Sequence, residues 1–375
     1  MRVLVLVGTR PEAIKMAPIV LALRETAGVV PILCFTGQHR AMAEAVMGVF
    51  GIKPDIDLDV MQPGQSLEGL TAALMGKLPR VFEEQKPDMV LVQGDTTTAM
   101  VGALAAFYRG IAVGHVEAGL RTGDMQHPWP EEANRRLIGV LASRHYTPTR
   151  SATDNLLREN VEAASILETG NPVVDALLFV KSRIENEPSF RQRFDQKYGW
   201  LDRDRKMVLV TGHRRESFGG GFEGICRAIR EIAETPDVQI VYPVHLNPNV
   251  REPVNRMLSG VPNIHLLEPA GYDEFIYLMD RAYLILTDSG GIQEEAPSFG
   301  KPVLIMRETT ERREAIDAGV AKLVTTDYER IVAETNALLT QPQAYAAMVR
   351  VSNPFGDGTA ARRIAENVAK YASHT

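Results

Sequence analysis

Short apolar runs alternate with longer amphipathic stretches along almost the whole chain. In the first half, the runs at residues 3–7, 88–92 and 111–116 have the length and β-branched composition of buried strands. Helical stretches follow them, among them one that opens near Pro11 and an alanine-rich one at residues 98–108. This alternation is typical of βαβ units, in which a mainly parallel sheet carries helices on both faces.

The alternation restarts after a polar stretch at residues 181–205. The new strand-like runs lie at residues 207–211, 239–244, 264–267, 283–287 and 303–306. A weaker strand is expected in the first half at residues 145–147, and a last helix at about 359–372. We therefore predict an α/β protein with two halves of similar pattern and a boundary between residues 170 and 206.

Composition narrows the classes of function. A chain of 375 residues suits two domains of ordinary size, and its formal charge of −6 argues against nucleic acid as the main partner. Cys34 and Cys226 lie far apart without a CxxC motif, so buried reduced thiols and a cytoplasmic location are expected. The N-terminus does not resemble a signal peptide, and no run of about 18 apolar residues predicts membrane insertion.

The segment at residues 113–136 is the most informative about function. It is rich in glycine, proline and charge, and it follows directly on a strand-like run; its charged residues include Glu117, Arg121, Glu131 and Arg135. Ligands of α/β proteins bind where strands end, so we expect a binding site here. A solvated loop with incidental ion pairs is the alternative.

Two other strand ends of the first half carry candidate chemistry. The first strand leads into a turn and a helix start, where free backbone N–H groups, Arg10 and Lys15 could bind an anion. The run at residues 88–92 leads to Asp95, which could also be a helix cap. Asp95, Glu117 and Glu131 together make three carboxylates suited to acid–base work.

The second half repeats this logic at Ser289, Gly290 and Gly291, which precede a helix and form a second possible anion site. Glu295 could receive the hydroxyls of a ribose. Ser289 lacks a GxSxG motif, which argues against a serine hydrolase, and the eight histidines show no zinc-ligand spacing, so no metal site is predicted.

Seven motifs, which follow one another along the chain, make the resemblance to one enzyme family specific. GTRPEAIK, GDTTT, GHVEAGLRTGD with PWPEEANR, TGHRRESFG, YPVHLNPNVREPV, LTDSGGIQEEAP and TTER resemble those of the non-hydrolysing UDP-N-acetylglucosamine 2-epimerases, from residue 3 to about 372. The resemblance implies two Rossmann-like doubly wound domains facing a central cleft, as in B-type glycosyltransferases. It also implies a cytoplasmic homodimer that forms UDP-N-acetylmannosamine for cell-envelope polysaccharides. We expect a catalytic domain at 1–175, joined by the helix at 359–375, and a UDP-binding domain at 176–358.

The resemblance also assigns roles by position. The catalytic set that it implies is Asp95, Glu117, Glu131 and His213. The substrate-binding set is Arg10, Lys15, Arg135, Phe275, Ser289, Gly290, Gly291, Glu295 and Arg312. A second UDP-sugar would act as an allosteric activator at Gln38, His39, Gln65, Arg214 and His245. Arg313 and Ala270 depart from the usual pattern of the family and leave the local loop geometry open.

The implied reaction begins with loss of UDP, because the proton on the second sugar carbon is otherwise too weakly acidic for a carboxylate to remove. A 2-acetamidoglucal then forms and takes back a proton and UDP, and this chemistry requires no cofactor or metal. A B-type glycosyltransferase, a hydrolysing epimerase and a non-catalytic sugar-nucleotide sensor are the alternatives.

Overall fold

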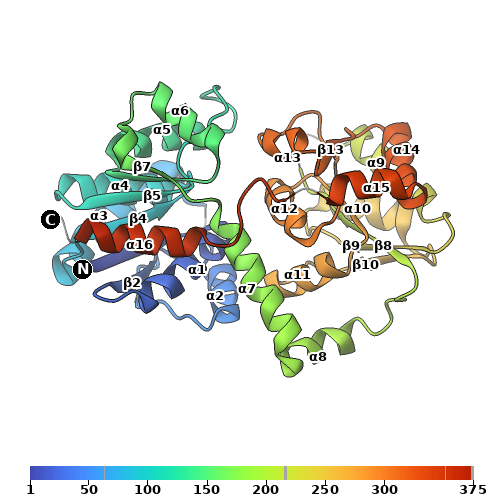
Figure 1. Ribbon diagram of the computed structural model, residues 1–375, viewed down its shortest axis with the longest axis horizontal. Helices are drawn as coiled ribbons and strands as arrows, with labels where there is room; N and C mark the ends of the chain where they lie inside the picture. Colours follow the sequence, from blue (N-terminus) through green and yellow to red (C-terminus); the bar gives the residue numbers. More distant parts are fainter. Residues whose placement is uncertain (63, 215–217, 351, 373–375) are drawn as a thin grey trace. The chain divides into compact units, whose positions relative to one another are not determined.

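The computed structural model describes residues 1–62, 64–214, 218–350 and 352–372 (Figure 1). Its internal contacts divide the chain into two compact units. Unit 1 contains residues 1–178 and the C-terminal segment that starts at Phe355, whereas unit 2 contains residues 179–354. The expected assignment of catalysis to one domain and of nucleotide binding to the other stays a prediction.

Unit 1 is built on a parallel sheet. Among the described residues its strands are β1 (Arg2–Val7), β2 (Val30–Phe35), β3 (Ile56–Asp57), β4 (Met89–Gln93), β5 (Ala112–Val116), β6 (Arg144–Thr147) and β7 (Ile166–Glu168). They lie in the order β3-β2-β1-β4-β5-β6-β7, and each neighbouring pair is parallel. The order reverses between β1 and β4, and the crevice at such a reversal is where open α/β sheets bind ligands.

The helices of unit 1 form two groups. They are α1 (Arg10–Glu25), α2 (Arg40–Val49), α3 (Leu67–Gln85), α4 (Thr97–Tyr108), α5 (Glu131–Leu141), α6 (Arg150–Arg158), the start of α7 (Pro172–Asn186) and α16 (Ala360–Ala372). Helix α1 packs against α2 and α16, and α4 packs against α3 and α5. Because crossovers between parallel strands are right-handed, a reversal of strand order places successive helices on opposite faces of the sheet.

The C-terminal helix α16 belongs to unit 1, where it lies beside α1 (Figure 1). The carboxylate of Asp175 accepts hydrogen bonds from the first two N–H groups of this helix, at 3.2 Å from Ala360 and 2.9 Å from Ala361. Burial raises the pKa of Asp175 to about 6, although these bonds act in the other direction. A single acidic side chain of α7 therefore fixes the start of α16.

One layer of the core of unit 1 lies between its sheet and helices α3, α4 and α5. Leu4, Leu6, Val90 and Val92 alternate inward from the central strands and are fully buried. A Cβ atom on Gly102 of α4 would lie 2.4 Å from Leu6, so glycine allows this helix to approach the sheet closely.

Unit 2 repeats the same topology. Its described strands are β8 (Lys206–Thr211), β9 (Val238–Pro243), β10 (Ile264–Leu267), β11 (Leu284–Thr287), β12 (Val303–Ile305) and β13 (Ala321–Leu323), in the parallel order β10-β9-β8-β11-β12-β13. Its described helices are α8 (Pro188–Lys197), α9 (Gly220–Ile232), α10 (Pro248–Leu258), α11 (Tyr272–Arg281), α12 (Gly290–Glu295), α13 (Arg313–Asp317), α14 (Tyr328–Thr340) and α15 (Pro342–Val349). Fully buried side chains of β8 and β9 pack against Phe222 and Ile229 of α9.

The prediction of two parallel α/β halves is confirmed. The pattern missed β3, β7 and β13, which are short and only partly buried, whereas the equally short β12 is fully buried and was predicted. The polar stretch at 181–205 contains the end of α7 and the whole of α8, of which only Phe194 is buried. No helix among the described residues is both long and apolar enough to cross a membrane.

Candidate active site

The candidate acids of unit 1 follow neighbouring strands of its sheet. Strands β1, β4 and β5 pair in that order, and their carboxyl ends lead to Arg10, Asp95 and Glu117. The parallel register therefore brings three loops to one edge of the sheet, where α5 adds Glu131 and Arg135. Arg10 forms no ion pair with any acid in the described part of the chain.

Glu117 is buried and held by donors from three other segments. Lys15 Nζ lies 2.5 Å from Glu117 Oε1, which also accepts from Asn171 Nδ2 at 3.1 Å. The amide of Gln93 donates to the other oxygen, Oε2. Glu117 also has a backbone φ of 62°, in the left-handed region that is unfavourable for a residue with a Cβ atom. Strain of this kind concentrates at functional sites, where the surrounding contacts maintain it.

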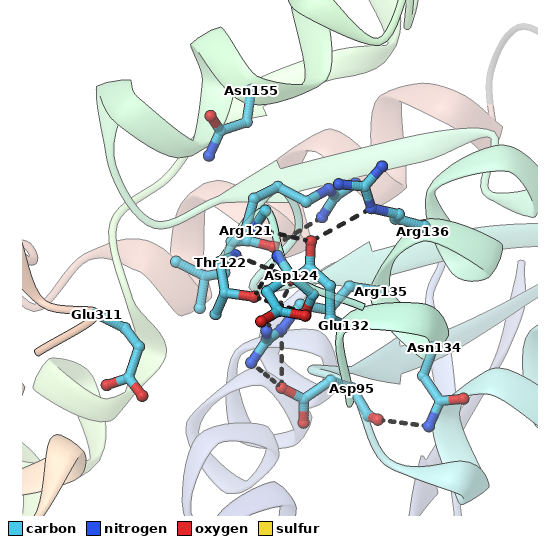
Figure 2. Close-up of polar contacts among 12 residues, drawn as sticks. Asp95, Arg121, Thr122, Asp124, Glu132, Asn134, Arg135, Arg136, Asn155 and Glu311 are labelled. Carbon is cyan, nitrogen blue, oxygen red and sulfur yellow. Dashed lines mark hydrogen bonds and ion pairs between the residues drawn. The ribbon is translucent and has the colours of Figure 1, made fainter. Parts of the chain in front are cut away.

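Asp95 forms a tight ion pair with α5 (Figure 2). Its Oδ2 atom accepts from Arg135 Nε at 2.9 Å and lies 2.6 Å from Arg135 Nη2. Asn134 of the same helix donates to the backbone carbonyl of Asp95 at 2.8 Å. Two consecutive residues of α5 therefore fix both the backbone and the side chain of Asp95.

Glu132 supports this pair and was not singled out from the sequence. Its carboxylate is fully buried, accepts from the backbone N–H of Thr122 at 3.0 Å, and lies 3.2 Å from both Arg135 and Arg136 (Figure 2). Burial raises the pKa of Glu132, but these donors outweigh burial and hold it below its ordinary value. The spacing Glu132, Arg135, Arg136 is the i, i+3, i+4 pattern of helical ion pairs, which could have identified it.

A pocket of about 300 Å³ lies at this edge within unit 1. The residues that line it are Thr9, Pro11, Gln38, His39, Leu67, Asp95, Thr96, Thr97, Pro130, Glu131 and Asn134. Asp95 and Glu131, two of the predicted catalytic acids, thus meet in one cavity. Glu131 Oε2 is buried and has no hydrogen-bond partner among the described residues. An acceptor left in this state in a pocket is suited to a ligand or to a proton.

Two of the residues expected at a regulatory site line the same pocket. Gln38 and His39 follow β2, and Gln38 Oε1 accepts from Thr98 at 3.3 Å. Gln65 lies on a separate turn, where its side chain accepts from the backbone N–H of Gln62 at 3.2 Å. The structure therefore associates Gln38 and His39 with Asp95 and Glu131, and it does not include Gln65 in the lining of that pocket.

Glu12 is a second acid that the sequence reasoning passed over. It lies on the first turn of α1, is almost fully buried, and accepts hydrogen bonds from Thr9 and Thr96, which both line the pocket. Burial raises its pKa to about 7, although those hydrogen bonds act in the other direction. A Glu three residues after a Thr at a helix start is a familiar capping pattern. The sequence therefore explained the contact of Glu12 with Thr9 and gave no sign of its contact with Thr96.

In unit 2, His213 follows β8 and is paired with an acid from the neighbouring strand β11. His213 Nδ1 lies 3.3 Å from Asp288 Oδ1, and Asp288 Oδ2 accepts from the backbone N–H groups of His213 and Arg214. Burial raises the pKa of Asp288, but the contacts with His213 outweigh it and lower the pKa. The ring of His245 stacks on His213 with centroids 5.3 Å apart. The sequence predicted His213 and did not predict its partner Asp288.

The glycine-rich turn of unit 2 lies against an arginine. Ser289 precedes α12, and a Cβ atom on Gly290 would lie 3.1 Å from Arg312 Cζ. Arg312 Nε donates to Glu294 at 2.9 Å. Three of the predicted binding residues, Ser289, Gly290 and Arg312, are thus brought together.

The other predicted residues of unit 2 are more dispersed. Glu295 is buried at the last position of α12, and Phe275 is partly buried on α11. Arg313 is the first residue of α13, a position that also suits proline, and Ala270 lies one residue before the N-cap of α11. Residues 215–217 of the TGHRRESFG motif lie outside the described residues.

Comparison with known proteins gives a consistent result. Residues 21–369 match the sequence profile of the family described as UDP-N-acetylglucosamine 2-epimerase. UDP-N-acetylglucosamine 2-epimerases of Yersinia pestis and Escherichia coli (strain K12) are 58% and 57% identical to the chain; the alignments cover 97% and 98% of both partners. The crystal structure of the Neisseria meningitidis UDP-GlcNAc 2-epimerase bound to UDP-GlcNAc superposes with a TM-score of 0.92 at 46% identity, covering 99% of this chain and 100% of that one.

Proposed function

The chain belongs to the UDP-N-acetylglucosamine 2-epimerase family, and we propose that it interconverts UDP-N-acetylglucosamine and UDP-N-acetylmannosamine. The observation that carries the proposal is the 58% identity, over 97% of both chains, to an enzyme of that name. The pocket lined by both Asp95 and Glu131 supports it. The product would supply the synthesis of cell-envelope polysaccharides.

The proposed route is elimination of UDP followed by its return. Departure of UDP from the first sugar carbon makes the neighbouring proton labile, and its removal gives a 2-acetamidoglucal. A proton delivered to the opposite face, followed by addition of UDP, gives the epimer. Such a route needs two acid–base groups in different environments.

Asp95, Glu117 and Glu131 differ in environment as this route requires. Glu117 is held by Lys15, Gln93 and Asn171, so it is suited to act in its ionised form. Asp95 is paired with Arg135, whereas Glu131 keeps one oxygen without a partner among the described residues. Glu131 is therefore the group best suited to exchange a proton with a ligand.

The remaining residues are assigned to binding. Arg10 and Lys15 would contact the substrate from unit 1, and Arg135 would assist near the sugar or phosphate. From unit 2, Ser289, Gly290, Gly291 and Arg312 would bind the diphosphate, and Phe275 and Glu295 the uridine. His213 stays in the catalytic set, where it would stabilise the charge of the leaving diphosphate. A homodimer and activation by a second UDP-sugar remain part of this proposal.

Incubation with UDP-N-acetylglucosamine in deuterated water tests the route. We expect UDP-N-acetylmannosamine that carries deuterium at the second sugar carbon, without accumulation of free N-acetylmannosamine. Epimer without the label would contradict proton exchange at that carbon. Stoichiometric release of UDP and free sugar would instead indicate a hydrolysing enzyme.

A further inference from the structure

Glu12 is placed behind the pocket of unit 1 and connects two of the loops that form it. One carboxylate oxygen, Oε2, accepts from the N–H of Gly8 at 3.1 Å, from the N–H of Thr9 at 2.6 Å and from Thr9 Oγ1 at 2.8 Å. These bonds lie within the turn between β1 and α1. On their own they would be an ordinary helix-capping arrangement.

The other oxygen leaves that turn. Glu12 Oε1 accepts from Thr96 Oγ1 at 2.8 Å, across 84 positions of the sequence. The same hydroxyl accepts from the N–H of Ala99 at 3.0 Å and so caps α4. The Thr96 hydroxyl therefore donates its hydrogen bond to Glu12 and at the same time accepts one from the start of α4.

Asp95 directly precedes Thr96 and is otherwise anchored from α5. Asn134 holds its carbonyl and Arg135 holds its carboxylate, as described above. The bond from Thr96 to Glu12 restrains this loop from the side of the β1–α1 turn. Thr9 and Thr96 both line the pocket beside Asp95, so the bond also sets the separation of two of its walls.

We propose that Glu12 is a positioning residue of the active site, which acts through Thr96 to hold the carboxylate of Asp95 in place in the pocket. The inference rests on the proposed function, because it assumes that Asp95 takes part in the reaction. Glu12 lies one layer behind the pocket and is not itself among the residues that line it.

The matched pair Thr96→Val and Thr96→Ser tests the link, because serine keeps the hydroxyl and valine removes it. We expect Thr96→Val to lower kcat by about tenfold to a hundredfold with KM changed by less than about threefold, since small displacements of a reacting group cost that much. Thr96→Ser should restore kcat. Equal values of kcat for the two variants would overturn the proposal.

A double-variant cycle separates positioning from general damage. If Glu12 acts through Thr96, then Glu12→Gln combined with Thr96→Val should lower kcat no further than the worse single variant. Losses that multiply would indicate independent effects and overturn the proposal. Thr149→Val is the control for loss of a helix cap, because Thr149 caps α6 in the same way and does not line the pocket. It should keep its kcat.

Crystal structures of the two Thr96 variants give a readout that does not depend on turnover. The Asp95 carboxylate should move away from Arg135 in Thr96→Val and keep its position in Thr96→Ser. An unmoved Asp95 in both variants would overturn the proposal even if activity fell. Absence of UDP-sugar epimerisation by the unaltered chain would instead overturn the proposed function, and the crystal structures would still decide the role of Glu12.

Discussion

Lys15 Nζ and Glu117 Oε1 lie 2.5 Å apart, although 102 positions separate them in the sequence. Lys15 comes from the second turn of α1 and Glu117 from the residue after β5, and both side chains are largely shielded from solvent. A shielded ion pair of this kind keeps its strength better than one on the surface, because water screens it less. It holds the Glu117 carboxylate in place beside a positive charge.

The first prediction concerns this pair. Glu117→Gln should lower kcat by about a hundredfold or more while UDP binding is retained, because the amide conserves volume but neither accepts a proton nor attracts Lys15. Steady-state kinetics and calorimetric titration with UDP measure the two effects. Glu83→Gln is the matched control, because Glu83 forms an exposed ion pair with Arg109 on the surface of unit 1. Near-normal kcat in Glu117→Gln would remove Glu117 from the catalytic set.

Adjacent acids of α5 should separate activity from stability. Glu131→Gln is expected to lower turnover by about a hundredfold with little change in melting temperature, since one of its oxygens has no partner among the described residues. Glu132→Gln should destabilise the fold by about 1–3 kcal/mol, since it weakens the buried contacts of this side chain with Arg135, Arg136 and the N–H of Thr122. Thermal unfolding and kcat, measured on both variants, check the contrast. If Glu131→Gln lowered stability and Glu132→Gln lowered only turnover, then Glu132 would be the catalytic residue and Glu131 the structural one.

The pH dependence of stability should report on Asp175, whose pKa is raised to about 6 in the folded chain. The folded state holds this proton more tightly than the unfolded state, so the stabilisation is present at low pH and is lost as the pH rises from about 4 to about 6. The loss amounts to at most about 3 kcal/mol. Asp175→Asn cannot ionise, and it keeps an acceptor for one of the two N–H groups, since Ala360 and Ala361 bond to different carboxylate oxygens.

The melting temperature of Asp175→Asn relative to the unaltered chain should therefore rise as the pH increases from 4 to 7. Differential scanning calorimetry at several pH values measures this difference. A difference that does not change with pH would show that Asp175 titrates at its ordinary value in the folded chain.

A fourth prediction concerns the expected homodimer. Helices α4 and α5 of unit 1 pack together and carry four strongly exposed apolar side chains: Phe107 (54%), Tyr108 (67%), Leu137 (51%) and Val140 (85%). Apolar patches of this kind mark interaction surfaces, and a second copy of the chain is the expected occupant. Val140→Asp should convert a dimer to a monomer in sedimentation velocity. Val30→Asp, a change at an exposed apolar residue on β2, should not.

The last prediction tests activation by a second UDP-sugar. Because Gln38 and His39 share a pocket with Asp95, substitutions there distinguish a regulatory from a substrate-binding role. If they bind an activator, the unaltered chain should depend sigmoidally on UDP-N-acetylglucosamine, and His39→Ala should give hyperbolic kinetics with kcat largely retained. A hyperbolic response of the unaltered chain, combined with a raised KM in His39→Ala, would instead place His39 at the substrate.

The sequence predicted those features of the fold and the site that depend on a local pattern of residues. Buried strands such as β1 and β5 showed as apolar runs, and the charged residues at their ends, including Asp95 and Glu117, pointed to one edge of a parallel sheet. The family motifs then supplied roles for single residues. Both kinds of inference use residues that are close in sequence or have matching positions in relatives.

The contacts that cross between loops had no such signal. Glu12 showed only its capping role, because its bond to Thr96 depends on how closely two loops approach after folding. Likewise, the sequence did not mark Asp288 as a partner of His213, because their pairing follows from the register of β8 beside β11. Tertiary geometry, and not residue type, decides which acids support a site and which face it.

Unit 1 is assembled from two segments of the chain, and unit 2 is encoded between them. A ribosome therefore finishes all of unit 2 before it reaches α16, which packs against α1 and whose first N–H groups bond to Asp175. Domains fold as units during synthesis once their residues have emerged. Unit 2 can consequently fold before α16 has been synthesised. Unit 1, whose synthesis begins first, is therefore the unit that completes its fold last.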